Sequence, residues 1–414
     1  MKSKILRPSS ICLHSKITFN MLLCTVSLIC VLLVAMRYRY TLSRTDSTAV
    51  QHIRHLDLAI TVLRDSTLNS RAIPNRRLVT AFGIDNSFTT ASLEKNRSFI
   101  ARVQGLLRTD DGDFSRLASN AMRMFYHRLQ LMGTTNNVPL VEMVQVLVLR
   151  VVLDKFFPEI PTPSEADALS ITRNINIQWV RSKDGNTSFD PTQVQSQRAL
   201  KSALRTVFQL HHNSHVSLAA ESNPLNILLP SYEALWQVVL SGFVQLGFNS
   251  HYFDTAIWLK QLEVFLDRPT RMAFDDATGN TSIRYIVAEI LRLYPPTKRI
   301  KRFYDGHLID IDVEYLQRDL EIWGNDGCVF KPERWRTITE RQEKAYMPFG
   351  SGKFVCPSRR VVGPMLIGIL VAVLVKGFKN SFEVVGKDGE KVVFGDGLLE
   401  SGRSAYTQLK LRRI

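Results

Sequence analysis

A lone cysteine in a glycine-containing loop is the residue best placed to do chemistry. The segment Pro348–Pro357 reads PFGSGKFVCP, and Cys356 follows Phe349 and Gly352 in it. A cysteine thiolate binds iron, and beneath a haem it pushes electron density onto the metal and favours O–O cleavage. We expect Gly350 and Gly352 to let the backbone approach a bound ring and to turn N–H groups toward the sulfur. The alternative for Cys356 is an ordinary buried cysteine.

A carboxylate and two arginines form a second candidate group. Glu289 and Arg292 are three residues apart, so on a helix they share a face and can pair directly. An exposed pair of this kind contributes little to stability. Context sets this pair apart, because LYPP follows it and the segment Phe330–Trp335 (FKPERW) precedes the cysteine loop. A buried Glu289 between Arg292 and Arg334 would lock that segment to the helix, and removing one partner of such a network costs about 3–5 kcal/mol.

Hydrophobic periodicity indicates the elements that must position these groups. Charged residues, among them Glu142, Arg150 and Asp154, interrupt the apolar run at 138–157, so this run predicts a buried helix rather than a membrane span. Short strands with a turn are expected in 299–314, and hairpins in 382–414. The sequence therefore predicts a mainly α fold with small β-sheets. Helices are predicted at 93–107, 115–132, 138–157, 225–246, 281–294 and 361–378, with two more inside 165–222.

The N-terminal segment predicts a membrane anchor. Residues 17–36 (ITFNMLLCTVSLICVLLVAM) contain no charged residue, and about twenty helical residues match the hydrocarbon layer of a bilayer. A cleaved signal peptide is the alternative, but no small-residue cleavage site follows the run. Positive charges flank both ends, so the orientation stays open. The predicted organisation is an anchor at 1–36, a linker with helical pieces and a shortened N-terminal part at 37–76, and a catalytic domain at 77–414.

Composition excludes several classes of protein. The chain has 53 Lys and Arg against 38 Asp and Glu, a formal net charge of +15, but no basic run with interleaved aromatic residues. We therefore expect no nucleic-acid partner. The positive charge instead favours an anionic membrane surface or an acidic protein. Of the five cysteines, only Cys328 and Cys356 lie beyond the N-terminal segment, which argues against a disulfide framework or a cysteine zinc site.

Together these motifs resemble the cytochrome P-450 superfamily. The cysteine loop matches the family's F-x-x-G-x-x-x-C pattern at Phe349, Gly352 and Cys356. The pair Glu289–Arg292 matches its helical E-x-x-R pattern, and segment 330–335 is similar to its P-E-R-F element. The resemblance covers about residues 77–414 and implies the cytochrome P-450 fold, preceded by one N-terminal transmembrane helix. The amino-acid sequence around the motifs is similar to that of fungal members, and the anchor is similar to that of members in the endoplasmic reticulum.

For the site, the resemblance implies that residues 77–414 are a haem-binding catalytic domain. It makes Cys356 the axial ligand of the haem iron. It implies that Glu289, Arg292 and Arg334 are a structural lock of this domain. The candidate residues for binding the haem ring and its propionates are Phe349, Gly350, Gly352, Lys353, Cys356, Arg97, Arg102, Arg299 and Arg302.

The chain departs from the family pattern at three places, one of which is Ser358, where the family usually has a glycine two residues after the cysteine. The basic residue that the family usually has two positions before the cysteine is Phe354 here, and Lys353 is the expected substitute. The family's acid–threonine pair for oxygen activation corresponds to Glu233 and Ala234 in the central helix, so Glu233 is the candidate catalytic residue. Its alternative is an acid on the helix surface. Ala234 has no hydroxyl, and Ser231, a water or a substrate hydroxyl would have to replace it.

The implied activity is that of a haem-thiolate monooxygenase, which inserts one oxygen atom of dioxygen into an apolar small molecule. A fungal secondary metabolite or lipid is the expected substrate class, by analogy. Electrons would come from NADPH through a separate flavoprotein reductase that faces Lys331, Lys353, Arg359 and Arg360. The expected location is the endoplasmic reticulum membrane, single-pass, with the catalytic domain in the cytosol. Two alternatives stay open: a haem-thiolate isomerase or dehydratase that needs no reductase, and a catalytically decayed haem-binding relative.

Overall fold

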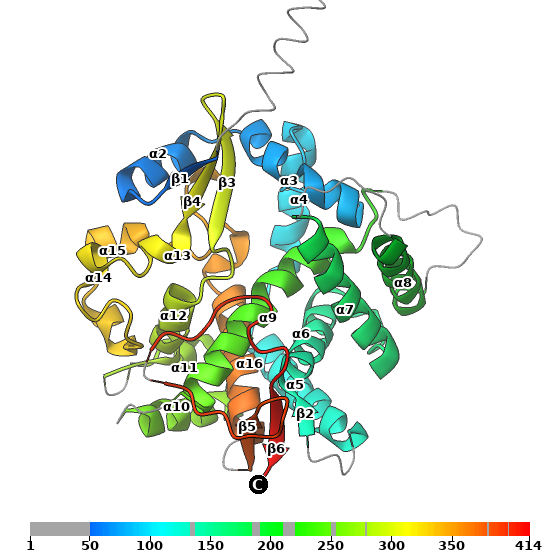
Figure 1. Cartoon of the computed structure of the whole chain (residues 1–414), viewed down its shortest axis with the longest axis vertical. Helices are drawn as coiled ribbons and strands as arrows, with labels where there is room; N and C mark the ends of the chain where they lie inside the picture. The colour runs from blue at the N-terminus through cyan, green and yellow to red at the C-terminus, as the bar shows by residue number, and fades with distance from the viewer. Residues whose placement is uncertain are drawn as a thin grey trace, which may run out of the picture. The chain divides into compact units, whose positions relative to one another are not determined.

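Helices form most of the described chain, as the apolar periodicity predicts (Figure 1). The protein is described here by a computed structural model, covering residues 50–132, 137–183, 191–209, 220–249, 254–277, 280–378, 381–395 and 397–414. Residues His52–Ile414 form one compact unit. The helices are α2 (Leu56–Asp65), α3 (Leu68–Phe82), α4 (Leu93–Leu106), α5 (Asp111–Leu131), α6 (Leu140–Phe156), α7 (Glu165–Arg181), α8 (Pro191–Val207), α9 (Leu225–Gly247), α10 (Thr255–Asp267), α11 (Arg271–Asp275), α12 (Ile283–Leu293), α13 (Val313–Leu316), α14 (Leu320–Trp323), α15 (Glu340–Ala345) and α16 (Val362–Phe378).

Two three-stranded sheets accompany the helices. In the first, the strand order is β1 (Gln51–Ile53), β4 (His307–Asp312) and β3 (Arg299–Tyr304), and β3 pairs antiparallel with β4 so that Lys301 faces Asp310. In the second, the order is β2 (Asn137–Pro139), β6 (Lys410–Arg413) and β5 (Phe382–Val385), with antiparallel pairing throughout. Short 3-10 helices precede α16: η1 (Pro332–Arg336), η2 (Gly352–Phe354) and η3 (Pro357–Arg359).

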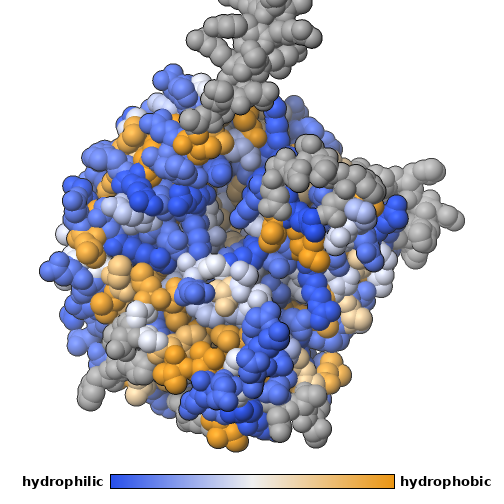
Figure 2. Space-filling view, in the orientation of Figure 1, coloured by the Kyte–Doolittle hydropathy of each residue, from blue (hydrophilic) through white to orange (hydrophobic). Residues whose placement is uncertain are grey.

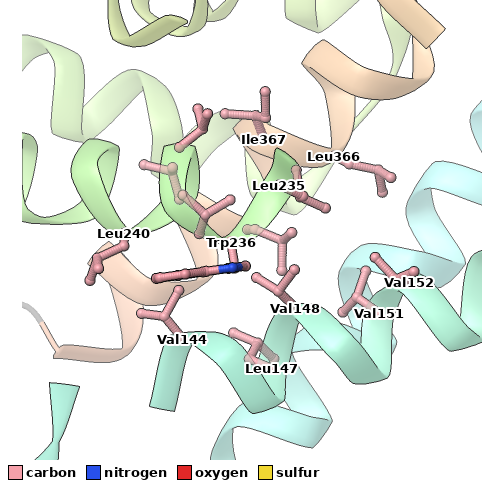
Figure 3. Packing of buried hydrophobic residues seen from close by; sticks show 14 of the residues in the cluster. Val144, Leu147, Val148, Val151, Val152, Leu235, Trp236, Leu240, Leu366 and Ile367 are labelled. Carbon is pink, nitrogen blue, oxygen red and sulfur yellow. The ribbon is translucent and has the colours of Figure 1, made fainter. Parts of the chain in front are cut away.

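The centre of the core lies between apolar helices. Helix α9 packs on both α6 and α16. Figure 3 shows Trp236 of α9 lying against Val144, Leu147 and Val148 of α6. All four side chains are buried, and fully burying a residue such as Val or Leu contributes about 1.5–3 kcal/mol. Since α16 begins directly after the cysteine loop, this core also anchors the loop.

One described helix has the length and apolar composition of a membrane span, but it is a core helix. This helix is α9, and 78% of its most apolar 18-residue stretch is buried inside the protein. The apolar run at 138–157 forms the buried helix α6, as predicted. The predicted anchor at residues 17–36 lies outside the described residues.

A proline inside α9 ties this helix to the connection between α3 and α4. Pro230 has no N–H, so it cannot donate to the carbonyl of Asn226 one turn earlier. That carbonyl instead accepts a hydrogen bond from Asn86 Nδ2 at 3.1 Å, and Asn226 Oδ1 accepts from the Asp85 N–H at 2.8 Å. Asn86 and Asn226 are both buried. The proline therefore leaves an acceptor that holds the α3–α4 connection against the start of α9.

Two parts of the chain differ from expectation. Residues 52–76, expected in a linker with helical pieces, form α2 and the first part of α3 inside the compact unit, because α3 packs on β3. In the C-terminal tail, a bridge between Val385 and Lys391 closes the expected turn around Gly389. The second expected hairpin is not found among the described residues 392–395 and 397–409, since β6 pairs with β5 instead.

Candidate functional site

Two backbone hydrogen bonds close the loop that presents Cys356. The N–H of Gly350 donates to the Met347 carbonyl at 2.9 Å, and the N–H of Cys356 donates to the Phe349 carbonyl at 2.9 Å. The thiol is half-buried, and its Sγ lies 3.1 Å from the hydroxyl of Ser358. A hydroxyl that donates to a thiolate stabilises the charged form. The loop therefore offers one fixed, accessible sulfur.

The two loop glycines have left-handed backbone conformations, with φ of +72° at Gly350 and +69° at Gly352. They differ in their surroundings. A Cβ at Gly350 would have its nearest neighbour at 3.8 Å, whereas one at Gly352 would lie 2.8 Å from the carbonyl carbon of Leu63 and closer still to its oxygen. Gly352 therefore seats the loop against the end of α2. The sequence predicts a close approach to a bound ring at this position, and the structure shows a close approach to another backbone.

Two buried arginines flank the aromatic ring of Phe354. The guanidinium carbon of Arg71, on α3, lies 4.9 Å from the ring centroid, and that of Arg302, on β3, lies 5.8 Å from it. Arg71 also donates to Ser87 Oγ at 3.0 Å, and Arg302 donates to the Lys301 carbonyl at 2.8 Å. Both side chains are buried. The packing of α3 on β3 brings the two cations to the cysteine loop.

These two cations have no counter-charge in the described part of the chain. Neither Arg71 nor Arg302 lies within ion-pair distance of a described carboxylate, and Arg302 Nε has no hydrogen-bond acceptor there. Burial lowers the pKa of Arg302 to about 10. Burial also lowers the pKa of Arg71 to about 9; the charge of Arg302 acts in the same direction, and Cys356 opposes it. Since an anion beside these groups would favour their charged forms, the pair suits the carboxylates of a ligand bound next to the cysteine loop.

The other residues proposed for the propionates lie elsewhere. Arg97 and Arg102 are exposed on α4. Arg299 lies 3.3 Å from Asp312 and 3.9 Å from Asp310, so its charge is already paired. Of these four arginines, the structure brings only Arg302 into a buried position at the cysteine loop.

Lys353, the expected substitute for a basic residue at position 354, is exposed. Its charge acts on Asp65 at the end of α2, where the hydrogen bond from Arg64 is the main cause that lowers the carboxyl pKa and Lys353 adds to it. Arg71 is the functional candidate that the sequence analysis missed. No motif surrounds it, and only the fold reveals that it stacks on Phe354.

The structure brings together the predicted group on α12. Glu289 is fully buried and accepts hydrogen bonds from Arg292 Nε at 2.9 Å and Nη2 at 2.7 Å. It also accepts from Arg334 Nε at 2.9 Å, the Lys331 N–H at 3.0 Å and Trp335 Nε1 at 3.0 Å. Three of these donors belong to or adjoin η1. The carboxylate therefore joins α12 to the segment that precedes the cysteine loop.

Arg292 extends this network to two further segments. Its Nη1 donates to the carbonyls of Gln317 at 2.8 Å and Gly327 at 2.6 Å. Its guanidinium carbon lies 4.7 Å from the ring centroid of Trp323. The side chain is fully buried, so every one of these contacts replaces water that the group loses on folding. Glu289 and Arg292 therefore hold several segments of the fold together.

Glu233 is engaged by the C-terminal segment. It is buried on α9 and forms an ion pair with Arg403, whose Nη1 also donates to Asn176 Oδ1 at 2.8 Å. The Arg403 guanidinium carbon lies 5.3 Å from the ring centroid of Trp179 and 5.4 Å from that of Trp236. The described polar contacts of Glu233 are therefore with Arg403 and not with the cysteine loop. Ser231 Oγ donates to the carbonyl of Ile227 at 2.9 Å.

Comparison with known proteins adds to this geometry. Residues 281–391 match the family described as cytochrome P-450. The chain is 31% identical over 99 residues to cytochrome P-450 72A11 of Arabidopsis thaliana, covering 20% of this chain and 19% of that protein. It is 38% identical over 69 residues to benzoate 4-monooxygenase bphA of Aspergillus niger, covering 16% and 13%. These matches span about a fifth or less of the length of the curated relatives.

Solved structures match over a longer part of the chain. CYP175A1 from Thermus thermophilus superposes with a TM-score of 0.61 at 16% identity, covering 87% of this chain and 88% of that one. Cytochrome P-450EX alpha (CYP152N1), solved with myristic acid, has a TM-score of 0.56 at 19% identity, covering 86% and 88%. At these identities the likeness establishes the fold.

Proposed function

We propose, from the premise that the family match, the curated relatives and the shared fold all support the cytochrome P-450 superfamily, that this chain is a haem-thiolate monooxygenase. The observation that carries the proposal is the half-buried thiol of Cys356 in a loop whose Phe354 contacts two buried guanidiniums that have no carboxylate partner among the described residues. Cys356 would ligate the haem iron, and Arg71 and Arg302 would bind the propionates. A thiolate-bound haem supplies the activation of dioxygen.

The residues of this chain would hold and tune that group. The Ser358 hydroxyl, 3.1 Å from Sγ, would donate to the thiolate and moderate its charge. Gly352 keeps the loop seated on α2, and the network around Glu289 keeps the preceding segment in place. The ring of Phe354 contacts both guanidiniums. These parts make a rigid support for one axial ligand.

Replacing the ligand tests the proposal directly. We expect Cys356→Ser to abolish the reduced carbon monoxide difference spectrum of a thiolate-bound haem and NADPH-dependent oxygenation, because a serine hydroxyl does not supply the thiolate's electron density. Cys328→Ser is the matched control, since Cys328 is exposed, and it should keep both signals. A wild-type protein that takes up no haem would contradict the proposal.

Removal of the two buried cations should weaken haem binding. We expect the double variant Arg71→Gln with Arg302→Gln to bind haem at least about tenfold more weakly in a transfer assay with apomyoglobin, because hydrogen bonds to charged groups contribute about 1.5–3 kcal/mol each. Arg97→Gln with Arg102→Gln is the matched control on exposed α4 positions and should change little. The haem-free double variant should be no less stable than the wild type, because it loses two uncompensated buried charges; a large loss of stability would indicate a structural role instead.

The remaining parts of the proposal concern partners and place. We infer that NADPH supplies electrons through a separate flavoprotein reductase that faces Lys331, Lys353, Arg359 and Arg360; Lys353, Arg359 and Arg360 are exposed. The substrate would be an apolar small molecule such as a fungal secondary metabolite or lipid. Residues 17–36 would anchor the protein in the endoplasmic reticulum membrane, with the catalytic domain in the cytosol.

A haem-thiolate isomerase or dehydratase is the second candidate. Two observations favour it: Ala234 has no hydroxyl, and the charge of Glu233 is engaged by Arg403. Neither residue then offers a free proton donor for dioxygen chemistry. Turnover of a peroxide or rearrangement of a substrate without NADPH and reductase would favour this candidate, whereas strict dependence on both would exclude it.

A further inference from the structure

Three cations surround the indole of Trp179, on α7. The guanidinium carbon of Arg77 lies 5.1 Å from its ring centroid, that of Arg403 lies 5.3 Å from it, and the amine of Lys183 lies 5.9 Å from it. These groups come from α3, the C-terminal segment and the residues just after α7. The tertiary fold brings Arg77 and Arg403 to Trp179, whereas Lys183 follows Trp179 by four residues.

The cluster has more positive than negative charge. Among the described residues, Glu233 is the carboxylate of this cluster, and Arg403 donates to both of its oxygens. Within the described part of the chain, Arg77 and Lys183 have no carboxylate at ion-pair distance; Arg77 instead donates to the Ser182 hydroxyl. One acid thus compensates one of three cations.

The charge of one cation lowers the pKa of another, as expected for like charges without an anion between them. Burial lowers the pKa of Arg77, and the charge of Arg403 lowers it further. Partial burial likewise lowers the pKa of Lys183, and the charges of Arg403, Arg77 and Lys301 add to that effect, against the opposing charge of Glu233. Lys301 lies on β3, so the positive region reaches from α7 to the strand that also carries Arg302.

The cluster is accessible from the surface. Lys183 and Lys301 are exposed, Arg77 and Trp179 are half-buried, and the side chain of Arg403 is 14% exposed. In the orientation of Figure 1, Figure 2 shows a hollow in the protein surface between β3 and α3, the two elements that carry Lys301 and Arg77. A ligand can therefore meet the charged side chains before it meets the aromatic ones.

We propose that this cluster binds the carboxylate of an organic acid with an apolar body, with Arg77 and Lys183 holding the carboxylate and Trp179 contacting the apolar part. Guanidinium and ammonium groups form charge-assisted hydrogen bonds with carboxylates, and the indole offers a large apolar face. This inference rests on the proposed function, because it names the substrate class of that enzyme. A neutral apolar molecule would leave Arg77 and Lys183 without a carboxylate partner in the described part of the chain.

The site is distinct from the pair that would hold the haem propionates. Arg71 and Arg302 flank Phe354, and Arg77 and Lys183 flank Trp179. Variants at Arg77 and Lys183 should therefore leave the haem content unchanged, which separates this inference from a further contact with the cofactor.

Affinity for a matched pair of ligands tests the inference. Isothermal titration of the full-length, haem-loaded protein would compare decanoate with decan-1-ol, which has the same chain without the charge. We expect decanoate to bind at least about tenfold more tightly, corresponding to one charge-assisted pair. In the double variant Arg77→Gln with Lys183→Gln, this preference should disappear, with the affinity for the alcohol unchanged.

A control variant removes the same charge elsewhere. Lys201→Gln with Arg205→Gln changes two exposed residues of α8 and should keep the preference for decanoate. Equal binding of acid and alcohol by the wild type, or a preference that survives in the Arg77 and Lys183 variant, would overturn the inference. A protein that prefers decanoate but shows no thiolate-haem spectrum would instead contradict the proposed function and leave the anion site in place.

Discussion

Replacement of Gly352 by alanine is expected to abolish haem uptake and to destabilise the cysteine loop by more than about 3 kcal/mol. The new Cβ would lie 2.8 Å from the carbonyl carbon of Leu63, closer to its oxygen and 3.1 Å from the Arg64 nitrogen. These are backbone atoms of α2, so no flexible side chain can move aside, and overpacking of this kind costs about 1–3 kcal/mol or more. The left-handed φ of +69° adds roughly 1–2 kcal/mol for a residue with a Cβ.

Gly350→Ala is the matched control for this prediction. Its φ of +72° carries the same backbone penalty, but the nearest atom to its Cβ would be 3.8 Å away. We expect this variant to lose about 1–2 kcal/mol and to retain haem. Urea unfolding and the reduced carbon monoxide spectrum measure both effects. Similar behaviour of the two variants would show that the contact with α2 is unimportant and that conformation alone explains both glycines.

Glu289→Gln is expected to lower the free energy of unfolding by about 3–5 kcal/mol, the cost of leaving buried charges without their partner. The amide has nearly the same shape as the carboxylate, but it cannot accept from all the donors that surround it. Arg292 is fully buried and Arg334 nearly so. The loss is a large share of a typical domain stability of about 5–15 kcal/mol, so weak expression and loss of haem should accompany it.

The control for this prediction uses the same residue spacing on an exposed helix. Glu94 and Arg97 also stand three apart, and no described residue of α4 is buried. Glu94→Gln should therefore change the free energy of unfolding by less than about 0.5 kcal/mol. A Glu289→Gln protein with the wild-type urea midpoint would show that the buried network adds nothing to stability.

The elements of the fold were largely predictable because their signals are local. The apolar run at 225–246 forms α9 (Leu225–Gly247), and the run at 361–378 forms α16 (Val362–Phe378). The turn at Asp305-Gly306 separates β3 from β4, with both residues at positive φ. Periodicity and turn residues determine such elements over a few neighbours. The spacing of Glu289 and Arg292 on one helical face is also a local signal, and it was predictable for the same reason.

The parts of the site that escaped prediction depend on contacts between distant segments. Arg71 has no motif, and it acquires a role only when α3 packs on β3 and places its guanidinium over Phe354. The sequence pattern makes Glu233 a candidate acid for oxygen chemistry, but it pairs with Arg403, 170 residues further along the chain. No hydrophobic pattern or spacing rule in a single sequence encodes a pair of that separation.

The hydrogen bonds around Pro230 restrict the motion of the α3–α4 connection. If residues 85–90 swung away as a flap, the Asn226 carbonyl would lose Asn86, and no N–H at position 230 could replace it. An unsatisfied buried carbonyl costs about 1–3 kcal/mol, which disfavours this motion. The α3–α4 connection is therefore expected to stay packed against the start of α9 when other segments move.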